Sequence, residues 1–61
     1  MKTYNSLKKE VFNAIKKGNN TTRMIIAYCD AELRYREFCK ALAELQIEGK
    51  IIYNANGYVL A

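Results

Sequence analysis

The sequence contains no histidine, tryptophan or proline, and it has only three glycines and two cysteines among its 61 residues. Without histidine, and with Cys29 and Cys39 outside any Cys-x-x-Cys pair, the sequence predicts neither a metal site nor a disulfide framework. It also lacks a glycine-rich phosphate loop and a pair of carboxylates in a catalytic pattern. We therefore expect a protein that is not an enzyme and that binds no metal or cofactor.

Long apolar segments are also missing. The longest uninterrupted run, 24–27, is extended only by Tyr28 and Cys29, which is far short of a membrane span. The first ten residues, MKTYNSLKKE, are charged but are not followed by the apolar segment of a secretory signal. We expect a cytoplasmic protein that does not contact a membrane.

Length and composition set the scale of the fold. A chain of 61 residues has room for one small domain, predicted to span 1–61, and its 51% hydrophobic residues are enough for a core. The formal net charge of +4 favours anionic partners such as nucleic acid. The same charge is common in small proteins for solubility alone, so charge does not decide the function.

The first predicted element is a helix over about 5–17. Asn5 or Ser6 can cap its first turn, and Gly18 can adopt the left-handed conformation that ends it. Phe12 lies off the apolar stripe and indicates either a second packing neighbour or a contact surface. The stripe itself recurs at helical spacing and comprises Leu7, Val11, Ala14 and Ile15, with Tyr4 ahead of it.

The segment GNNTT, 18–22, predicts a loop with Thr21 or Thr22 as the next helix cap. No glycine or proline follows until Gly49, so one long helix shared between two chains is an alternative. The apolar phase argues against it, because two sets of apolar residues would face different sides of a straight helix. The first set is Ile25, Cys29 and Leu33, and the second is Phe38, Leu42 and Leu45. We therefore predict a second helix over about 22–30, a turn within 30–34, and a third helix over about 34–48 that also buries Ala41.

After Gly49 the pattern changes to two β-branched and aromatic triplets, IIY and YVL. The residues between them, Asn54 to Gly57, end in Asn-Gly, which is typical of a tight turn because both residues tolerate positive φ. A β-hairpin over about 50–60 is the natural interpretation, and alternation places Ile51 with Tyr53, and Tyr58 with Leu60, on one face. Two strands alone are only marginally stable in water, so we expect the hairpin to pack on the helices.

The segment FCKALAELQIEGKI, followed by GYVL, resembles the winged helix-turn-helix family. The positions that match its pattern are Phe38, Leu42, Leu45, Gly49, Ile51, Tyr58 and Leu60, and Ile26-Ala27 is similar to a pair often found in the second helix. The chain departs from the pattern where DAEL replaces the usual glycine or serine of the turn, and where the wing is short and uncharged. The resemblance implies a mostly α fold of three helices with a small β-hairpin.

In such domains the third helix enters the major groove of DNA. The resemblance therefore implies a regulator of transcription that binds double-stranded DNA, and the small size suggests the stand-alone type carried by bacteria, phages or plasmids. Arg36 and Lys40 lie opposite the predicted buried stripe and can reach guanine edges or phosphates. The supporting set, expected to contact mainly the DNA backbone, is Arg34, Tyr35, Arg23, Thr22, Lys50 and Asn56.

A second interpretation comes from a different functional class. The same fold can serve as a protein interaction module, binding a host factor or a second copy without touching DNA. A homodimer also fits DNA binding, because paired half-sites increase the number of contacts. Apolar residues off the predicted core faces are candidates for that surface, namely Phe12, Ile52 and Val59.

Overall fold

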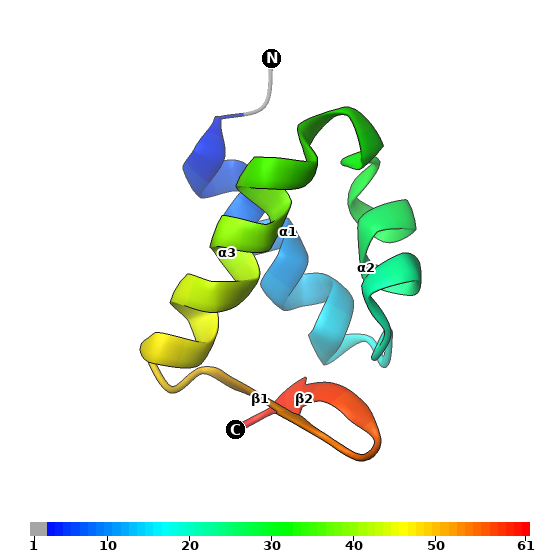
Figure 1. Ribbon diagram of the computed structural model, residues 1–61, viewed down its shortest axis with the longest axis vertical. Helices are drawn as coiled ribbons and strands as arrows, with labels where there is room; N and C mark the ends of the chain where they lie inside the picture. Colours follow the sequence, from blue (N-terminus) through cyan, green and yellow to red (C-terminus); the bar gives the residue numbers. More distant parts are fainter. Residues whose placement is uncertain (1–2) are drawn as a thin grey trace.

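The computed structural model describes residues 3–61 and has three α-helices followed by a β-hairpin (Figure 1). The predicted fold class, mostly α with a small hairpin in the order of a winged helix domain, is confirmed. Residues 1 and 2 of the predicted domain lie outside the described residues. The elements are α1 (Tyr4–Lys16), α2 (Thr22–Cys29), the 3-10 turn η1 (Glu32–Arg34), α3 (Tyr35–Ile47), β1 (Ile51–Asn54) and β2 (Gly57–Leu60).

The ends of the first two helices are set by local hydrogen bonds. Thr3 caps α1, its side chain accepting a hydrogen bond from the backbone N–H of Ser6, so the prediction of Asn5 or Ser6 as the cap is wrong. A threonine hydroxyl just ahead of the helix satisfies an N–H group that the first turn leaves free. Thr21 caps α2 in the same way, its side chain accepting a hydrogen bond from the backbone N–H of Met24. The left-handed region at Gly18, with φ of 103°, ends α1 as expected.

A tight turn separates α2 from α3, and it contradicts the alternative of one long helix. Asp30 takes the left-handed conformation, with φ of 52°, that glycine more often supplies at a helix end. The chain then passes through η1 before α3 begins at Tyr35. The turn predicted within 30–34 is thus confirmed, and Leu33, which lies in it, is fully exposed. Its position in η1 takes it out of the phase of α2.

The core is formed by one side of each helix together with the first residue of the hairpin. The predicted stripes of α1 and α3 are buried, and among the largest fully buried side chains are Phe38, Leu7 and Ile25. Ile51 of β1 is 1% exposed and closes the core from below the helices. Phe12 is partly buried against this core, so it has the second packing neighbour considered above.

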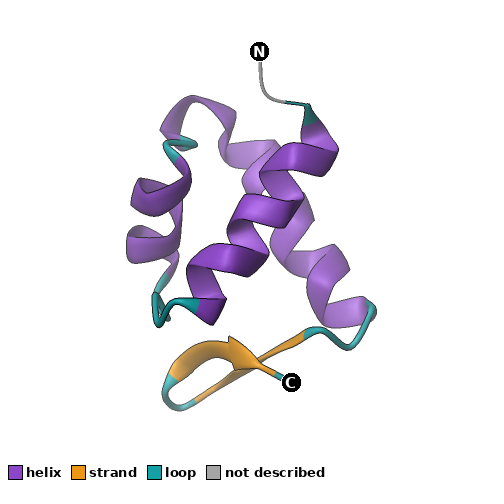
Figure 2. Ribbon diagram, turned by 180° about the vertical axis from the view of Figure 1, so that it is seen from behind, coloured by secondary structure: helices purple, strands orange, loops and turns teal. Residues whose placement is uncertain are grey.

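The hairpin crosses the open end of the helices (Figure 2). Its strands are antiparallel, with Tyr53 opposite Tyr58 and Asn54 opposite Gly57. Of the two residues that tolerate positive φ, Gly57 adopts it and Asn56 does not. Ile51 is buried as predicted, whereas Tyr53 and Leu60, predicted to share a packed face, are 65% and 42% exposed. The short strands extend past the edge of the core.

One residue of the loop between α1 and α2 fastens the hairpin. The carbonyl oxygen of Asn20 accepts a 2.8 Å hydrogen bond from the N–H of Tyr58, and its side-chain amide donates a 2.9 Å bond to the carbonyl of Asn56. A Cβ atom on Gly57 would overlap the same carbonyl of Asn20. The close approach of the two backbones therefore requires glycine at this position.

Candidate nucleic-acid interface

The outer surface of α3 presents a strip of exposed residues. At about 100° per residue, Arg36, Lys40, Ala43 and Ile47 fall on one side of the helix, and all four are exposed. They lie opposite the buried Phe38, whose side of the helix faces the core. We call these four residues the α3 strip.

The acidic residues of α3 lie beside the strip, on the side that faces α1. The hydroxyl of Tyr4 donates a 2.6 Å hydrogen bond to Glu44, and the ammonium of Lys8 lies 3.2 Å from the same carboxylate. Lys8 also forms a hydrogen-bonded ion pair with Glu48. Two residues of α1 thus partly neutralise the two carboxylates nearest the end of α3.

These contacts change the proton affinities of the groups involved. The Tyr4 hydroxyl and then Lys8 lower the pKa of Glu44, and Lys8 lowers the pKa of Glu48, because both partners favour the charged carboxylate. Partial burial, followed by the bond to Glu44, raises the pKa of Tyr4 to about 12. The carboxylates are therefore ionised and hydrogen-bonded near neutral pH, with Tyr4 protonated.

The two basic residues of the strip differ in their surroundings. The ammonium of Lys40 lies 5.0 Å from the centre of the Tyr4 ring, a cation–π contact that orients it toward α1. Arg36 is exposed, and its side chain makes no hydrogen bond or ion pair with another residue within 3–61. Arg36 is consequently the cation of α3 that is most available to a ligand.

Arg34, the last residue of η1, is held by Glu37 in the first turn of α3. Its Nε and Nη2 atoms donate bonds of 2.8 and 2.7 Å to the two carboxylate oxygens of Glu37. This fork geometry lowers the pKa of Glu37 and neutralises both charges. Arg34 can therefore contact a phosphate only if the pair with Glu37 opens.

The other flank of the strip is uncharged. Tyr35 is 56% exposed and its ring packs 6.3 Å from that of Phe38. A hydrogen bond with Cys39 raises the pKa of the Tyr35 hydroxyl, and Cys39 itself is exposed. The phenol and the thiol are one turn apart, so they form one polar edge beside the strip.

The remaining predicted residues fall in two places. Thr22 and Arg23 are at the start of α2, and Asn20 of the preceding loop donates a hydrogen bond to the carbonyl of Asn56 at the tip of the hairpin. Lys50, which is 3.6 Å from Glu48, lies instead on the α1 side of α3. The structure thus brings Arg36 and Lys40 together on α3, joins the loop before α2 to the hairpin tip, and places Lys50 on the α1 side of α3.

Sequence reasoning did not include Ile47 and Cys39 among the site residues. Ile47 is 84% exposed and continues the strip seven residues after Lys40, a spacing that returns to the same side of a helix. An apolar side chain in this place suits contact with a thymine methyl group. The heptad spacing from Lys40 is the signal in the sequence that points to it.

No group of three histidine, cysteine or acidic side chains that would suit a metal ion occurs within 3–61. In the same range, each helix is too short or too polar to cross a bilayer. Comparison with protein-family models, with curated proteins and with solved structures found no match. The function must therefore be argued from the geometry of the chain itself.

Proposed function

We propose that the protein binds double-stranded DNA by placing the α3 strip in the major groove, and that it acts in the cytoplasm as a regulator of transcription. The observation that carries the proposal is the separation of charge around α3. Glu44 and Glu48 are turned toward α1 and bonded to Tyr4 and Lys8, whereas Arg36 remains exposed. The strip therefore presents positive charge to phosphates without carboxylates in the same line.

Groups outside α3 support the same orientation. The start of α2, with Thr22 and Arg23, offers backbone N–H groups and a cation of the kind that bind phosphate. Asn56 adds an amide from the hairpin tip, which Asn20 joins to the loop before α2. These groups contact the DNA backbone in the proposed complex, while Arg36 and Lys40 reach base edges or phosphates.

The test is a titration against mixed-sequence duplex DNA by fluorescence anisotropy at several salt concentrations. We expect Arg36→Ala with Lys40→Ala to weaken binding about tenfold or more at low salt, and to lower the slope of log affinity against log salt by about 1 for each lost phosphate contact. The matched control is Lys16→Ala with Lys17→Ala, which removes the same charge from the end of α1. Equal losses in the two double variants would show only a general charge effect and would overturn the assignment of α3.

A second candidate function is supported by exposed apolar residues. Leu33, Ile47 and Tyr53 are 101%, 84% and 65% exposed, which is typical of a protein that contacts another protein. In this function the same fold binds a protein partner and not DNA. A folded protein that does not bind DNA at low salt would favour it.

A further inference from the structure

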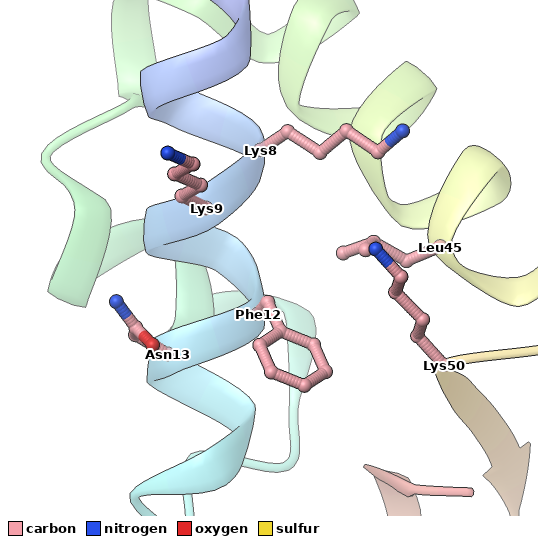
Figure 3. A pocket seen from close by; sticks show the side chains of 6 residues that line it. All are labelled: Lys8, Lys9, Phe12, Asn13, Leu45 and Lys50. Atoms are coloured by element: carbon pink, nitrogen blue, oxygen red, sulfur yellow. The ribbon is translucent and has the colours of Figure 1, made fainter. Parts of the chain in front are cut away.

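A hollow of about 370 Å³ opens at the surface between α1, the end of α3 and the start of the hairpin (Figure 3). Its apolar walls are Phe12, which projects from α1, and Leu45 of α3. Three lysines also line the hollow: the ammonium groups of Lys8 and Lys50 lie beside Leu45, and that of Lys9 lies across α1 from them. The hollow lies off the α3 strip, so it plays no part in the proposed DNA contact.

The lining of the hollow indicates the chemistry of its occupant. Phe12, which is only partly buried, offers apolar surface to an apolar side chain, and Leu45, which is 2% exposed, forms the floor beneath it, since burying apolar surface is favourable. Lys8 and Lys50 each form an ion pair with Glu48. Lys9 is exposed and forms no ion pair within the described part of the chain. The hollow therefore suits a large apolar side chain with a carboxylate next to it.

The chain itself carries a segment of this kind. Leu33 in η1 is 101% exposed, so its whole side chain projects into solvent. Asp30 and Glu32 stand on its N-terminal side, and both are exposed and make no ion pair with another residue of 3–61. The charge of the next residue, Arg34, is balanced by Glu37. Leu33 is thus an apolar side chain beside two available carboxylates.

The two features lie toward opposite ends of the molecule. The turn that contains Leu33 is at one end of the long axis, and the hairpin, with the hollow beside it, is at the other (Figure 1). The molecule is 32 Å long on this axis. Leu33 therefore cannot enter the hollow of its own chain, but it can enter that of a neighbour placed end to end.

We propose that the protein associates head to tail, with Leu33 of one copy packed against Phe12 and over Leu45 in the hollow of the next copy. Asp30 and Glu32 then face Lys9 and Lys50, so opposite charges surround the apolar contact. Each added copy leaves one Leu33 and one hollow unoccupied, so the association is open-ended rather than a closed dimer. The contact is small, so it is weak in free solution and depends on concentration.

This proposal does not depend on DNA binding, and it is tested without DNA by sedimentation of the purified protein over a wide range of concentration. The average mass should rise from the 7.0 kDa of the single chain and continue beyond that of a dimer. Leu33→Ser should abolish the rise without affecting folding, because Leu33 contacts no core residue. Ile47→Ser is the matched control, since it removes another exposed apolar residue and should leave the association unchanged.

Two further variants test the contribution of charge around the hollow. Lys9→Glu should weaken the association about tenfold, since it replaces attraction to Asp30 and Glu32 by repulsion. Lys17→Glu makes the same change in charge beyond the hollow and should have a much smaller effect. Equal effects of the two variants would overturn the proposed contact.

Mixing the two defective chains gives the most specific test. The Leu33→Ser chain keeps an intact hollow, and the Lys9→Glu chain keeps an intact Leu33. At concentrations where neither associates alone, the mixture should form a one-to-one complex that grows no further. A mixture that stays monomeric, a wild-type mass that stays constant, or one that stops at a dimer would each contradict the proposal.

Discussion

The hydroxyl of Tyr4 donates a 2.6 Å hydrogen bond to the carboxylate of Glu44, across 40 positions of sequence. The bond joins the first turn of α1 to the last half of α3, and the Tyr4 ring also lies beneath the ammonium of Lys40. One aromatic residue therefore contacts both a carboxylate and a cation of the proposed recognition helix. Tyr4 thereby holds the negative charge of Glu44 on the side of α3 that faces α1.

The first prediction concerns stability in acid. The folded-state pKa values of Glu37, Glu44 and Glu48 are lowered from 4.5, so the unfolded chain binds more protons than the folded chain as pH falls through this range. The stabilisation is present above pH 4.5 and is lost as the pH falls through the lowered values. Urea unfolding at a series of pH values measures it, and Lys8→Met should make the loss in acid smaller.

The ionisation of Tyr4 predicts the opposite dependence of stability on pH, a loss in alkali. Its folded-state pKa is raised from 10.0 to about 12, so its contribution is complete below pH 10 and is lost as the pH rises toward 12. Tyr4→Phe should remove this alkaline loss. An unchanged alkaline dependence in that variant would show that another group is responsible.

The second prediction compares two glycines with positive φ. Gly57→Ala should destabilise the protein by about 1–3 kcal/mol, because the new Cβ overlaps the carbonyl of Asn20 and the residue has a φ of 97°. Gly49→Ala is the control, since its φ is 76° but nothing lies within 4 Å of the added atom, and it should cost about 1 kcal/mol. Chemical denaturation of both variants tests the difference, and equal costs would argue against the close contact with Asn20.

The third prediction uses the two cysteines. Cys39 is exposed beside the α3 strip, whereas Cys29 is 1% exposed in the core. A maleimide should therefore modify Cys39 in the native protein and reach Cys29 only when the protein unfolds, as mass spectrometry would show. A bulky label on Cys39 should also reduce DNA affinity. Full affinity of the labelled protein would contradict the proposed placement of α3 in the groove.

The fourth prediction concerns the pair of Arg34 and Glu37. Glu37→Gln removes the charge that holds Arg34, so Arg34 becomes available to phosphate and DNA affinity should rise, with a salt slope steeper by about 1. Glu32→Gln is the control because it changes the net charge equally but leaves the Arg34 pair intact. Equal gains in the two variants would mean that net charge alone is responsible.

The sequence predicted the helices well because their signals are local. The apolar stripe of α1, the Thr21 cap and the glycines at 18 and 49 act within one or two helical turns, and the structure confirms each of them. The turn before α3 was predicted from apolar phase, although its left-handed residue is Asp30 and not glycine. Helical phase does not extend through η1, so it did not predict that Leu33 would project fully into solvent.

The side chains of the site were less predictable, because their partners are distant in sequence. The spacing of Glu44 on α3 identifies its side of the helix but not the hydroxyl of Tyr4 that binds it. The pairing of Arg34 with Glu37 is local, but the sequence pattern alone treated Arg34 as a cation available to phosphate. The hollow between Phe12 and Leu45 exists only after α1, α3 and the hairpin have packed together.

The bonds of Asn20 to the hairpin also bear on how the protein is made. A nascent chain that ends before residue 51 lacks Ile51, which closes the core, and Tyr58, which packs against it. The apolar ends of the helices remain open to water until both strands emerge. A nascent chain therefore acquires its native packing only after the hairpin has been synthesised, and arrest of translation before residue 51 would leave a species that chaperones and proteases recognise.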